Sequence, residues 1–200
     1  MLCQKSKVLV IIQKLTLMKT SADSLKKSAD ALNDSSLWEK KKIKKKDEKT
    51  GEEIEVEDYD WDKITKAVKS FVEDYNDVVK EAGESNTKDV LRNASWMTGM
   101  TDKNSNMLAK IGITIGKGNK LELDEDALKQ ADISSLKTVF TGYNSFVSKI
   151  SQKATGISNA ANRASATYTN NGTYSKTDSS LTSSKIDTVS YTHLTLPTIR

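Results

Sequence analysis

The N-terminal segment carries apolar side chains at gaps that alternate between three and four residues, and this spacing constrains the fold more than any other feature. The positions are Val8, Ile11, Leu15, Met18, Ala22, Leu25, Ala29 and Leu32. Such a heptad spacing places them on one stripe of an α-helix that packs against another helix. We therefore predict a heptad helix within residues 1–36. Its partner is either a second subunit or, as the pattern alone favours, another helix of the same chain.

The polar residues of this helix follow the same repeat. "SADSLKK" and "SADALND" are two versions of one seven-residue unit. Asp23, Lys26 and Asp30 fall outside the apolar stripe, as do Ser21 and Lys27, so we expect all of them to face water.

Three further stretches keep the alternating spacing and predict further helices. The first carries Trp61, Ile64, Val68, Phe71, Tyr75, Val78 and Ala82. The second carries Val90, Ala94, Met97, Thr101, Asn104, Leu108 and Ile111. The third carries Ile133, Leu136, Phe140, Tyr143, Val147, Ile150, Ala154, Ile157, Ala161 and Ala164. The sequence therefore predicts a mainly α protein, an elongated antiparallel helical bundle or coiled coil with one or two small β-hairpins.

Local signals give the ends of these helices. Asp60 precedes the first of the three stretches and is a candidate N-cap, because its carboxylate can accept from the first free backbone amides. Gly83 follows that stretch and is a candidate C-terminal cap. Gly142 interrupts the last stretch, where we expect a bend, because glycine weakens a helix interior.

Residues 37–59 form a charged insert. Six lysines lie within 40–46 and eight acidic residues within 47–60. The acidic residues argue against nucleic-acid binding by these lysines, because their negative charges cancel the local positive field. Gly51 lies in a turn-forming "KTG", and Ile54 and Val56 alternate with glutamates. We predict a solvated β-hairpin with Lys opposite Glu.

Composition excludes several function classes. Only three of the 31 basic residues are arginine, which disfavours a phosphate-binding or nucleic-acid partner. The single cysteine, Cys3, and the single histidine, His193, leave no pair for a disulfide, a histidine-based triad or a multi-histidine metal site. No apolar run approaches the ~20 residues of a membrane span, and no cleaved signal is predicted. We expect no enzymatic activity, no cofactor, no metal, no nucleic acid and no membrane partner.

The acidic "DYDWDKITKAVK" does not complete a calcium loop. Asp58, Asp60 and Asp62 fit the first three ligand positions, but Lys63 and Lys69 stand where glycine and a bidentate glutamate are needed.

The glycines of "GITIGKGNKLELDEDAL" raise the possibility of a phosphate-binding loop. The dinucleotide-binding motif G-x-G-x-x-G fails, because Leu121 stands at the position of its third glycine. The P-loop motif fails as well, because Gly118 stands where Ser or Thr is needed. A β-hairpin over residues 112–124 fits instead. Ile113 and Ile115 share one face, as do Leu121 and Leu123, and turn residues lie between them. Asp124 then caps a short helix.

The same region resembles the C-terminal region of the flagellar filament-capping protein, also called flagellar hook-associated protein 2. The matching residues are Leu108, Ile111, Gly112, Ile113, Leu121, Leu123, Asp124, Glu125, Leu128, Val139 and Phe140. "ITKAVKSFVEDYNDVV", with Phe71, Tyr75 and Asn76, is similar to the family's preceding helix. The resemblance covers residues 61–164, and 60–168 is predicted to be the capping-protein-like region. The family's β-rich head has only the charged hairpin in its place, so the chain is expected to be either a truncated gene product or a short, headless relative.

The C-terminal residues differ in character. Residues 169–189 are rich in Ser, Thr and Asn and predict a flexible tail in place of the family's last long helix. Residues 190–200, which include His193, resemble a translated adapter sequence and are expected to be non-native.

The resemblance implies a non-enzymatic structural protein of the bacterial flagellum. It implies a secreted, extracellular protein of cell motility, exported without a cleaved signal, that forms a homo-oligomer at the filament tip. Flagellin and other hook-associated proteins are the implied partners. The candidate assembly residues are Leu15, Met18, Leu25, Leu32, Trp61, Ile64, Val68, Phe71, Tyr75, Phe140, Ile150 and Ile157. The alternative is a stand-alone helical protein–protein interaction module, not tied to a flagellum and cytoplasmic or secreted.

Overall fold

A computed structural model describes residues 2–46 and 53–167. The predicted turn at Gly51, the predicted tail at 169–189 and the predicted non-native end at 190–200 lie outside the described residues. Within them the chain forms seven α-helices and two antiparallel two-stranded sheets. The prediction of a mainly α protein with small β-hairpins is therefore confirmed.

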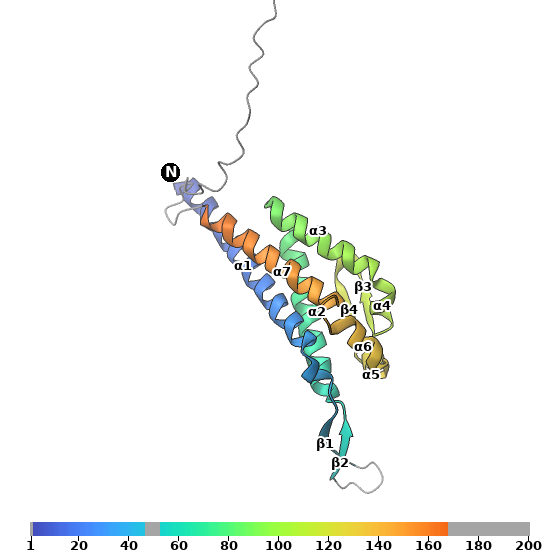
Figure 1. Cartoon of the computed structure of the whole chain (residues 1–200). Coiled ribbons are helices and arrows are strands. Elements are labelled where there is room, and N and C mark those ends of the chain that lie inside the picture. The colour runs from blue at the N-terminus through green and yellow to red at the C-terminus, as the bar shows by residue number, and fades with distance from the viewer. Residues whose placement is uncertain (1, 47–52, 168–200) are drawn as a thin grey trace, which may run out of the picture.

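Four long helices make up an elongated body (Figure 1). They are α1 (Leu2–Asn33), α2 (Trp61–Gly83), α3 (Lys88–Lys103) and α7 (Phe146–Ala166). α1 packs along α7 and α2, and α3 packs against α7 and α2. α1 and α7 are antiparallel, because Asp23 contacts Ser158 while Asp30, one heptad later, contacts Ser151.

Short elements connect the long helices. Between α1 and α2 lie the 3₁₀ turn η1 (Ser35–Trp38) and the strands β1 (Lys41–Lys46) and β2 (Glu53–Asp58). Between α3 and α7 lie α4 (Ser105–Ala109), β3 (Ile113–Ile115), η2 (Lys117–Asn119), β4 (Leu121–Leu123), α5 (Glu125–Gln130) and α6 (Ile133–Phe140). The β1–β2 ribbon extends from one end of the body, and the β3–β4 hairpin lies against its side (Figure 1).

Several predicted boundaries are confirmed. Asp60 caps α2 and accepts from the Lys63 amide at 3.1 Å. Asp124 caps α5 and accepts from the amides of Asp126 and Ala127, both at 3.0 Å. The predicted role of Gly83 is wrong: Gly83 is the last helical residue of α2 and does not have the positive φ of a left-handed cap.

One stretch predicted to be a single helix is broken, and the bend expected at Gly142 in another is a complete break. α3 ends at Lys103 and α4 begins at Ser105, with Asn104 between them donating its side-chain amide to the Met100 carbonyl at 2.8 Å. The last predicted helix divides into α6 and α7, because Gly142 adopts φ 102 and Ser145 caps a new helix by accepting from the Ser148 amide at 3.1 Å. Tyr143, expected on the apolar stripe, lies in this break and is 83% exposed.

Gly156 leaves α7 unbroken. A Cβ at this position would lie 2.9 Å from the Asn93 side-chain oxygen of α3. The absence of a side chain therefore allows α3 and α7 to approach closely.

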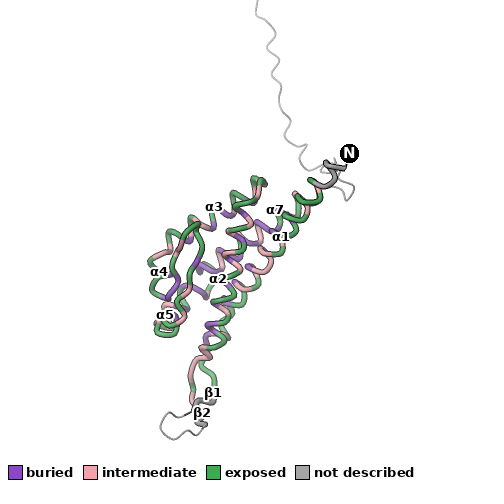
Figure 2. The backbone as a smooth tube through the Cα atoms, turned by 180° about the vertical axis from the view of Figure 1, so that it is seen from behind, coloured by how far each residue is buried: buried purple, intermediate pink, exposed green. Residues whose placement is uncertain are grey.

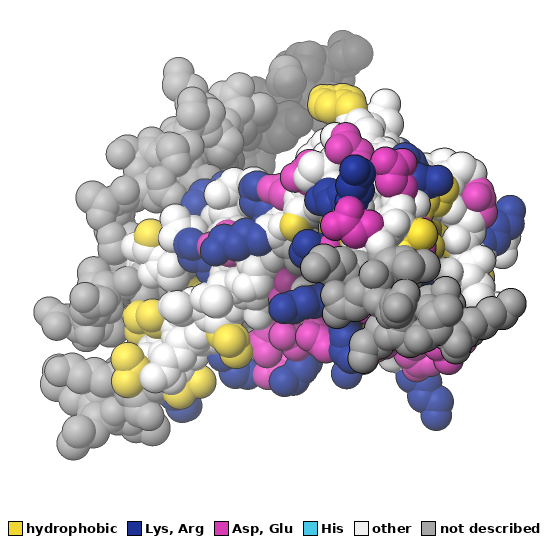
Figure 3. All heavy atoms as spheres, turned by 90° about the horizontal axis from the view of Figure 1, so that it is seen from below, with side chains coloured by type: hydrophobic (Ala, Val, Ile, Leu, Met, Phe, Trp, Pro, Cys, Tyr) yellow, Lys and Arg dark blue, Asp and Glu magenta, His cyan; other side chains and the backbone are white. Residues whose placement is uncertain are grey.

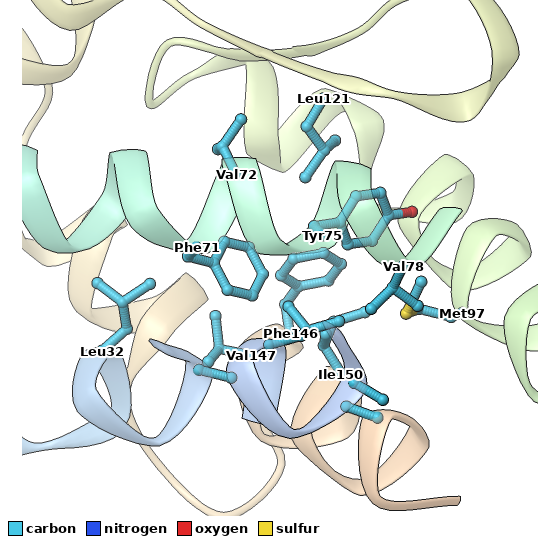
Figure 4. Packing of buried hydrophobic residues seen from close by; sticks show 14 of the residues in the cluster. Leu32, Phe71, Val72, Tyr75, Val78, Met97, Leu121, Phe146, Val147 and Ile150 are labelled. Carbon is cyan, nitrogen blue, oxygen red and sulfur yellow. The ribbon is translucent and has the colours of Figure 1, made fainter. Parts of the chain in front are cut away.

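The core lies between the long helices, and most buried positions in Figure 2 face inward along their length. Phe71 and Tyr75 of α2 pack near Phe146 of α7, with ring centroids 6.3 Å apart for Phe71 and Phe146 (Figure 4). Trp38 is only 1% exposed and stacks on Phe140 with centroids 5.4 Å apart. Trp38 was not predicted as a core residue, because it belongs to a single 3₁₀ turn that has no helical period.

Candidate functional site

The interface between α1 and α7 combines small apolar residues with regularly spaced polar contacts. Ala22, Ala29, Ala154 and Ala161 are all fully buried, which allows the two helix backbones to lie close together. Ser158 donates to Asp23 at 2.6 Å, and Ser151 donates to Asp30 at 2.6 Å. These acids and serines are each separated by one heptad, so the contacts repeat along the antiparallel pair.

Asp30 is exposed, as predicted, and Asp23 is half-buried, but both also contact α7, which was not predicted. Both lie beside the apolar stripe, where a side chain reaches the partner helix as well as solvent. Each also accepts a hydrogen bond from a lysine four residues earlier, Lys19 and Lys26 respectively. The repeated "SAD" unit thus builds the same Lys–Asp–Ser cluster twice.

These clusters change the acidity of their carboxylates. Hydrogen bonds from Lys19 and Ser158 lower the pKa of Asp23. Burial alone would raise the pKa of Asp30, but hydrogen bonds from Lys26 and Ser151 outweigh it, so the pKa of Asp30 is also lowered. Both carboxylates are therefore charged at neutral pH and stabilise the interface in that form.

The interface between α1 and α2 contains Asp74, a carboxylate whose pKa is raised and not lowered. Burial raises the pKa of Asp74, and the negative charges of Asp77 and Glu73 add to this effect, although a hydrogen bond from Ser28 partly offsets them. The charged form of Asp74 thus opposes folding, while its neutral form does not.

A polar contact also lies inside the contact of α2 with α3. The Tyr75 hydroxyl donates to Thr101 at 2.9 Å, and Thr101 donates to the Met97 carbonyl at 2.9 Å. Burial raises the pKa of Tyr75 to about 12. Thr101, which the sequence places on an otherwise apolar stripe, is 1% exposed and fixes α3 against α2 through this bond.

The β3–β4 hairpin docks on α2 through one asparagine. Ile113 pairs with Leu123 and Ile115 with Leu121, as predicted for residues 112–124. The Asn76 side-chain amide donates to the Leu121 carbonyl at 2.8 Å, and its oxygen accepts from the Leu121 amide at 2.7 Å. Asn76 therefore occupies the outer edge of β4 as a neighbouring strand would, and satisfies two backbone groups of a residue that is 2% exposed.

A glycine sets the entry to this hairpin. Gly112 adopts φ +79, and a Cβ there would lie 2.7 Å from the Asp124 carbonyl oxygen and 2.9 Å from the Leu128 nitrogen. The Asp124 amide donates to the Gly112 carbonyl at 2.8 Å. The backbone at Asp124 and Leu128 therefore packs directly against residue 112, and only glycine fits at this position.

Most predicted assembly residues lie inside the single chain. Eleven of the twelve are buried: Leu15, Met18, Leu25, Leu32, Ile64, Val68, Phe71, Tyr75, Phe140, Ile150 and Ile157. Trp61 is partly buried against the same core. The predicted partner of the N-terminal helix was either a second subunit or a helix of the same chain. In the structure these positions pack against helices of the same chain. Among the hairpin residues, Ile113 and Leu121 are buried, Ile115 and Leu123 are half-buried, and Asp124 caps α5.

The first turns of α1 continue the apolar stripe beyond its partners. The Asp23–Ser158 and Asp30–Ser151 register places Ala166, the last residue of α7, level with Leu15. Lys14 pairs at 3.1 Å with Glu84, the residue that follows α2. The α1 residues before Lys14 therefore extend past both helices, as Figure 1 shows.

Apolar side chains in this projecting part of α1 are exposed. The exposed fractions are 56% for Leu9, 48% for Val10 and 40% for Ile11. Beside Ile11 a groove of about 360 Å³ runs between α1, the end of α2 and the end of α7. Its floor is Leu15, Met18 and Ala164, and its rim includes the Lys14–Glu84 ion pair.

Among residues 2–46 and 53–167, no three His, Cys, Asp or Glu side chains are grouped as a metal site requires. In the same ranges, no helix combines the length and the apolar character needed to cross a bilayer.

The fold and these contacts define a class: an elongated helical protein whose parts are joined by heptad interfaces and an edge-docked hairpin. The family described as the flagellar hook-associated protein 2 C-terminus matches residues 85–192, more than half of the chain, and the chain belongs to this family. At the level of the family it is a structural component of the flagellar cap. No curated protein and no solved structure gives a significant match.

The matched range differs from the resemblance described above. It begins after α2 and extends through residues 169–189, which were predicted to form a flexible tail in place of the family's last long helix. Those residues lie outside the described part of the structure.

Proposed function

We propose that this chain is a non-enzymatic structural protein that assembles with copies of itself at the tip of the flagellar filament and helps arriving flagellin to assemble. Membership of the hook-associated protein 2 family is the observation that carries this proposal. The partners are a second copy of the chain, flagellin and other hook-associated proteins. The protein acts outside the cell, and export without a cleaved signal is part of the proposal.

The projecting part of α1 supports self-assembly. Its apolar stripe follows the heptad spacing that joins α1 to α7, but no described helix covers it. Ile11 is 40% exposed although Leu15, one turn later, is 6% exposed. A helix from a second copy would bury this stripe by continuing the same packing. Full burial of an isoleucine contributes about 1.5–3 kcal/mol, so burying the exposed 40% of Ile11 contributes roughly 0.6–1.2 kcal/mol, or about three- to eightfold in affinity.

Two experiments test the proposal. Deletion of the gene in its host is expected to abolish swimming and to leave flagellin unassembled in the medium, and the wild-type gene should restore both. In vitro, Ile11→Lys is expected to weaken self-association at least about three- to eightfold in sedimentation, with no loss of folding, because the monomer does not bury Ile11 fully. Leu91→Lys on α3, where the leucine is 42% exposed, is the control of matched exposure. Normal motility in the deletion strain contradicts the proposal.

The groove beside α1 favours a second candidate function, a stand-alone helical protein–protein interaction module not tied to a flagellum. Its apolar floor and charged rim fit an amphipathic helix of another protein. A deletion strain that swims and assembles flagellin normally would favour this alternative.

A further inference from the structure

The β1–β2 ribbon separates opposite charges onto its two strands. β1 has the sequence KKIKKK and β2 the sequence EIEVED. The register pairs Lys42 with Glu57, Lys44 with Glu55 and Lys46 with Glu53. Lys42 and Glu57 therefore lie opposite each other on one face of the ribbon. Ile43 pairs with Val56 on the other face, where both are half-buried.

Neither outer edge of the ribbon has a third strand beside it in the described part of the chain. β1 and β2 form a sheet of their own, in which each strand has one neighbour. An edge strand presents a row of backbone amides and carbonyls that another strand can pair with. One edge of this ribbon is basic and the other is acidic. Figure 3 shows basic and acidic side chains intermixed on the end of the molecule that carries the ribbon.

The charges discriminate between the two ways in which copies can pair. A two-fold symmetric contact joins an edge to itself, and so places lysines of β1 against lysines or acids of β2 against acids. A head-to-tail contact joins β1 of one copy to β2 of the next. If all copies have the same orientation, β1 of one copy runs antiparallel to β2 of the next, as β1 and β2 do within the chain. Opposite charges face each other only in this arrangement.

We propose that the ribbon is a self-assembly surface, on which the basic edge of β1 docks against the acidic edge of β2 from a second copy. The contact extends the two-stranded ribbon into a continuous antiparallel sheet, with the Ile43–Val56 pairs aligned on one face. Its polarity yields rings or open chains rather than closed dimers. This inference rests on the self-assembly stated in the proposed function and assigns it a second surface besides α1.

Three ribbon variants of the full chain test the proposal. The acidic variant carries Lys42→Glu, Lys44→Glu and Lys46→Glu. The basic variant carries Glu53→Lys, Glu55→Lys and Glu57→Lys. The swapped variant carries all six substitutions, so every cross-strand pair within the ribbon keeps opposite charges. The control carries Lys66→Glu, Lys88→Glu and Lys129→Glu at exposed positions on the body, which changes net charge as the acidic variant does.

Sedimentation of each protein is the measurement. Wild type should associate most strongly at low salt, and its association should weaken as salt approaches about 1 M, where charges are screened beyond ~3 Å; only the apolar contact through α1 should remain. The acidic and basic variants should each associate at least about tenfold more weakly, and their mixture should regain association. The swapped variant should associate by itself, and the control should resemble wild type.

The outcomes separate this inference from the proposed function. Wild-type association that neither the acidic nor the basic variant weakens overturns the ribbon contact and leaves assembly through α1 standing. A wild type that stays monomeric at every concentration overturns both. If the single-strand variants lose the ribbon fold, the swapped variant decides, because its internal pairs are intact: failure of the swapped variant to associate overturns the inference.

Discussion

Replacement of Asn76 by alanine tests whether one side chain holds the β3–β4 hairpin on α2. The asparagine makes two hydrogen bonds, at 2.7 and 2.8 Å, to the backbone of Leu121. Alanine retains helix propensity at this position, so α2 itself should be unaffected. The substitution removes the hydrogen-bond partners of the Leu121 amide and carbonyl, which belong to a residue that is only 2% exposed.

The structure gives the size of the effect. A buried backbone group that loses its partner costs about 1–3 kcal/mol, and Leu121 would lose two partners. Asn76 is itself only half-buried, so water enters after truncation and satisfies part of this loss. We therefore expect the free energy of unfolding to fall by about 2 kcal/mol, at the lower end of the summed range.

Urea unfolding followed by far-ultraviolet circular dichroism measures this change. Amide hydrogen exchange adds a local measurement: the Leu121 amide should exchange roughly 30-fold faster, since ~1.4 kcal/mol corresponds to a factor of ten. Asn86→Ala, at an exposed position after α2, should change stability by less than about 0.5 kcal/mol. A loss below about 0.5 kcal/mol for Asn76→Ala, with Leu121 exchange unchanged, would refute the docking role.

Three further predictions concern the fold. Phe71→Ala should lower the free energy of unfolding by about 3–5 kcal/mol in urea unfolding, because the ring is fully buried; a loss under ~1 kcal/mol would contradict its core position. Gly112→Ala should cost more than about 1 kcal/mol, while Gly83→Ala, whose Cβ meets nothing within 4 Å, should be neutral or stabilise by up to ~1 kcal/mol; equal effects would contradict the strain argument. Asp74→Asn should raise stability at pH 7, because burial raises the pKa of Asp74 and its ionisation opposes folding; the gain should disappear below the unfolded pKa, where both states are protonated, and a gain that is independent of pH would contradict this cause.

The spacing of apolar residues and of capping residues within short segments was enough to predict helix faces, helix caps and one hairpin. The heptad gaps from Leu15 to Leu32 predict which face of α1 is buried, because one helical turn fixes the direction of each side chain. Asp60 and Asp124 are recognisable as caps, since a cap bonds to amides two or three residues away. The β3–β4 pairing is likewise readable, because alternating apolar residues flank turn residues.

Tertiary structure decided everything that depends on which distant segments meet. The heptad period identifies the buried stripe of α1 but not its partners, and the partners made Asp23 and Asp30 interface residues. Asn76 is an ordinary polar helix residue until the chain brings Leu121 to it, 45 positions away. Trp38 has no periodic signal and is buried because Phe140 lies beside it. A local pattern fixes directions along one segment, whereas contacts depend on the path of the whole chain, and that path is selected by the packing free energy of all segments together.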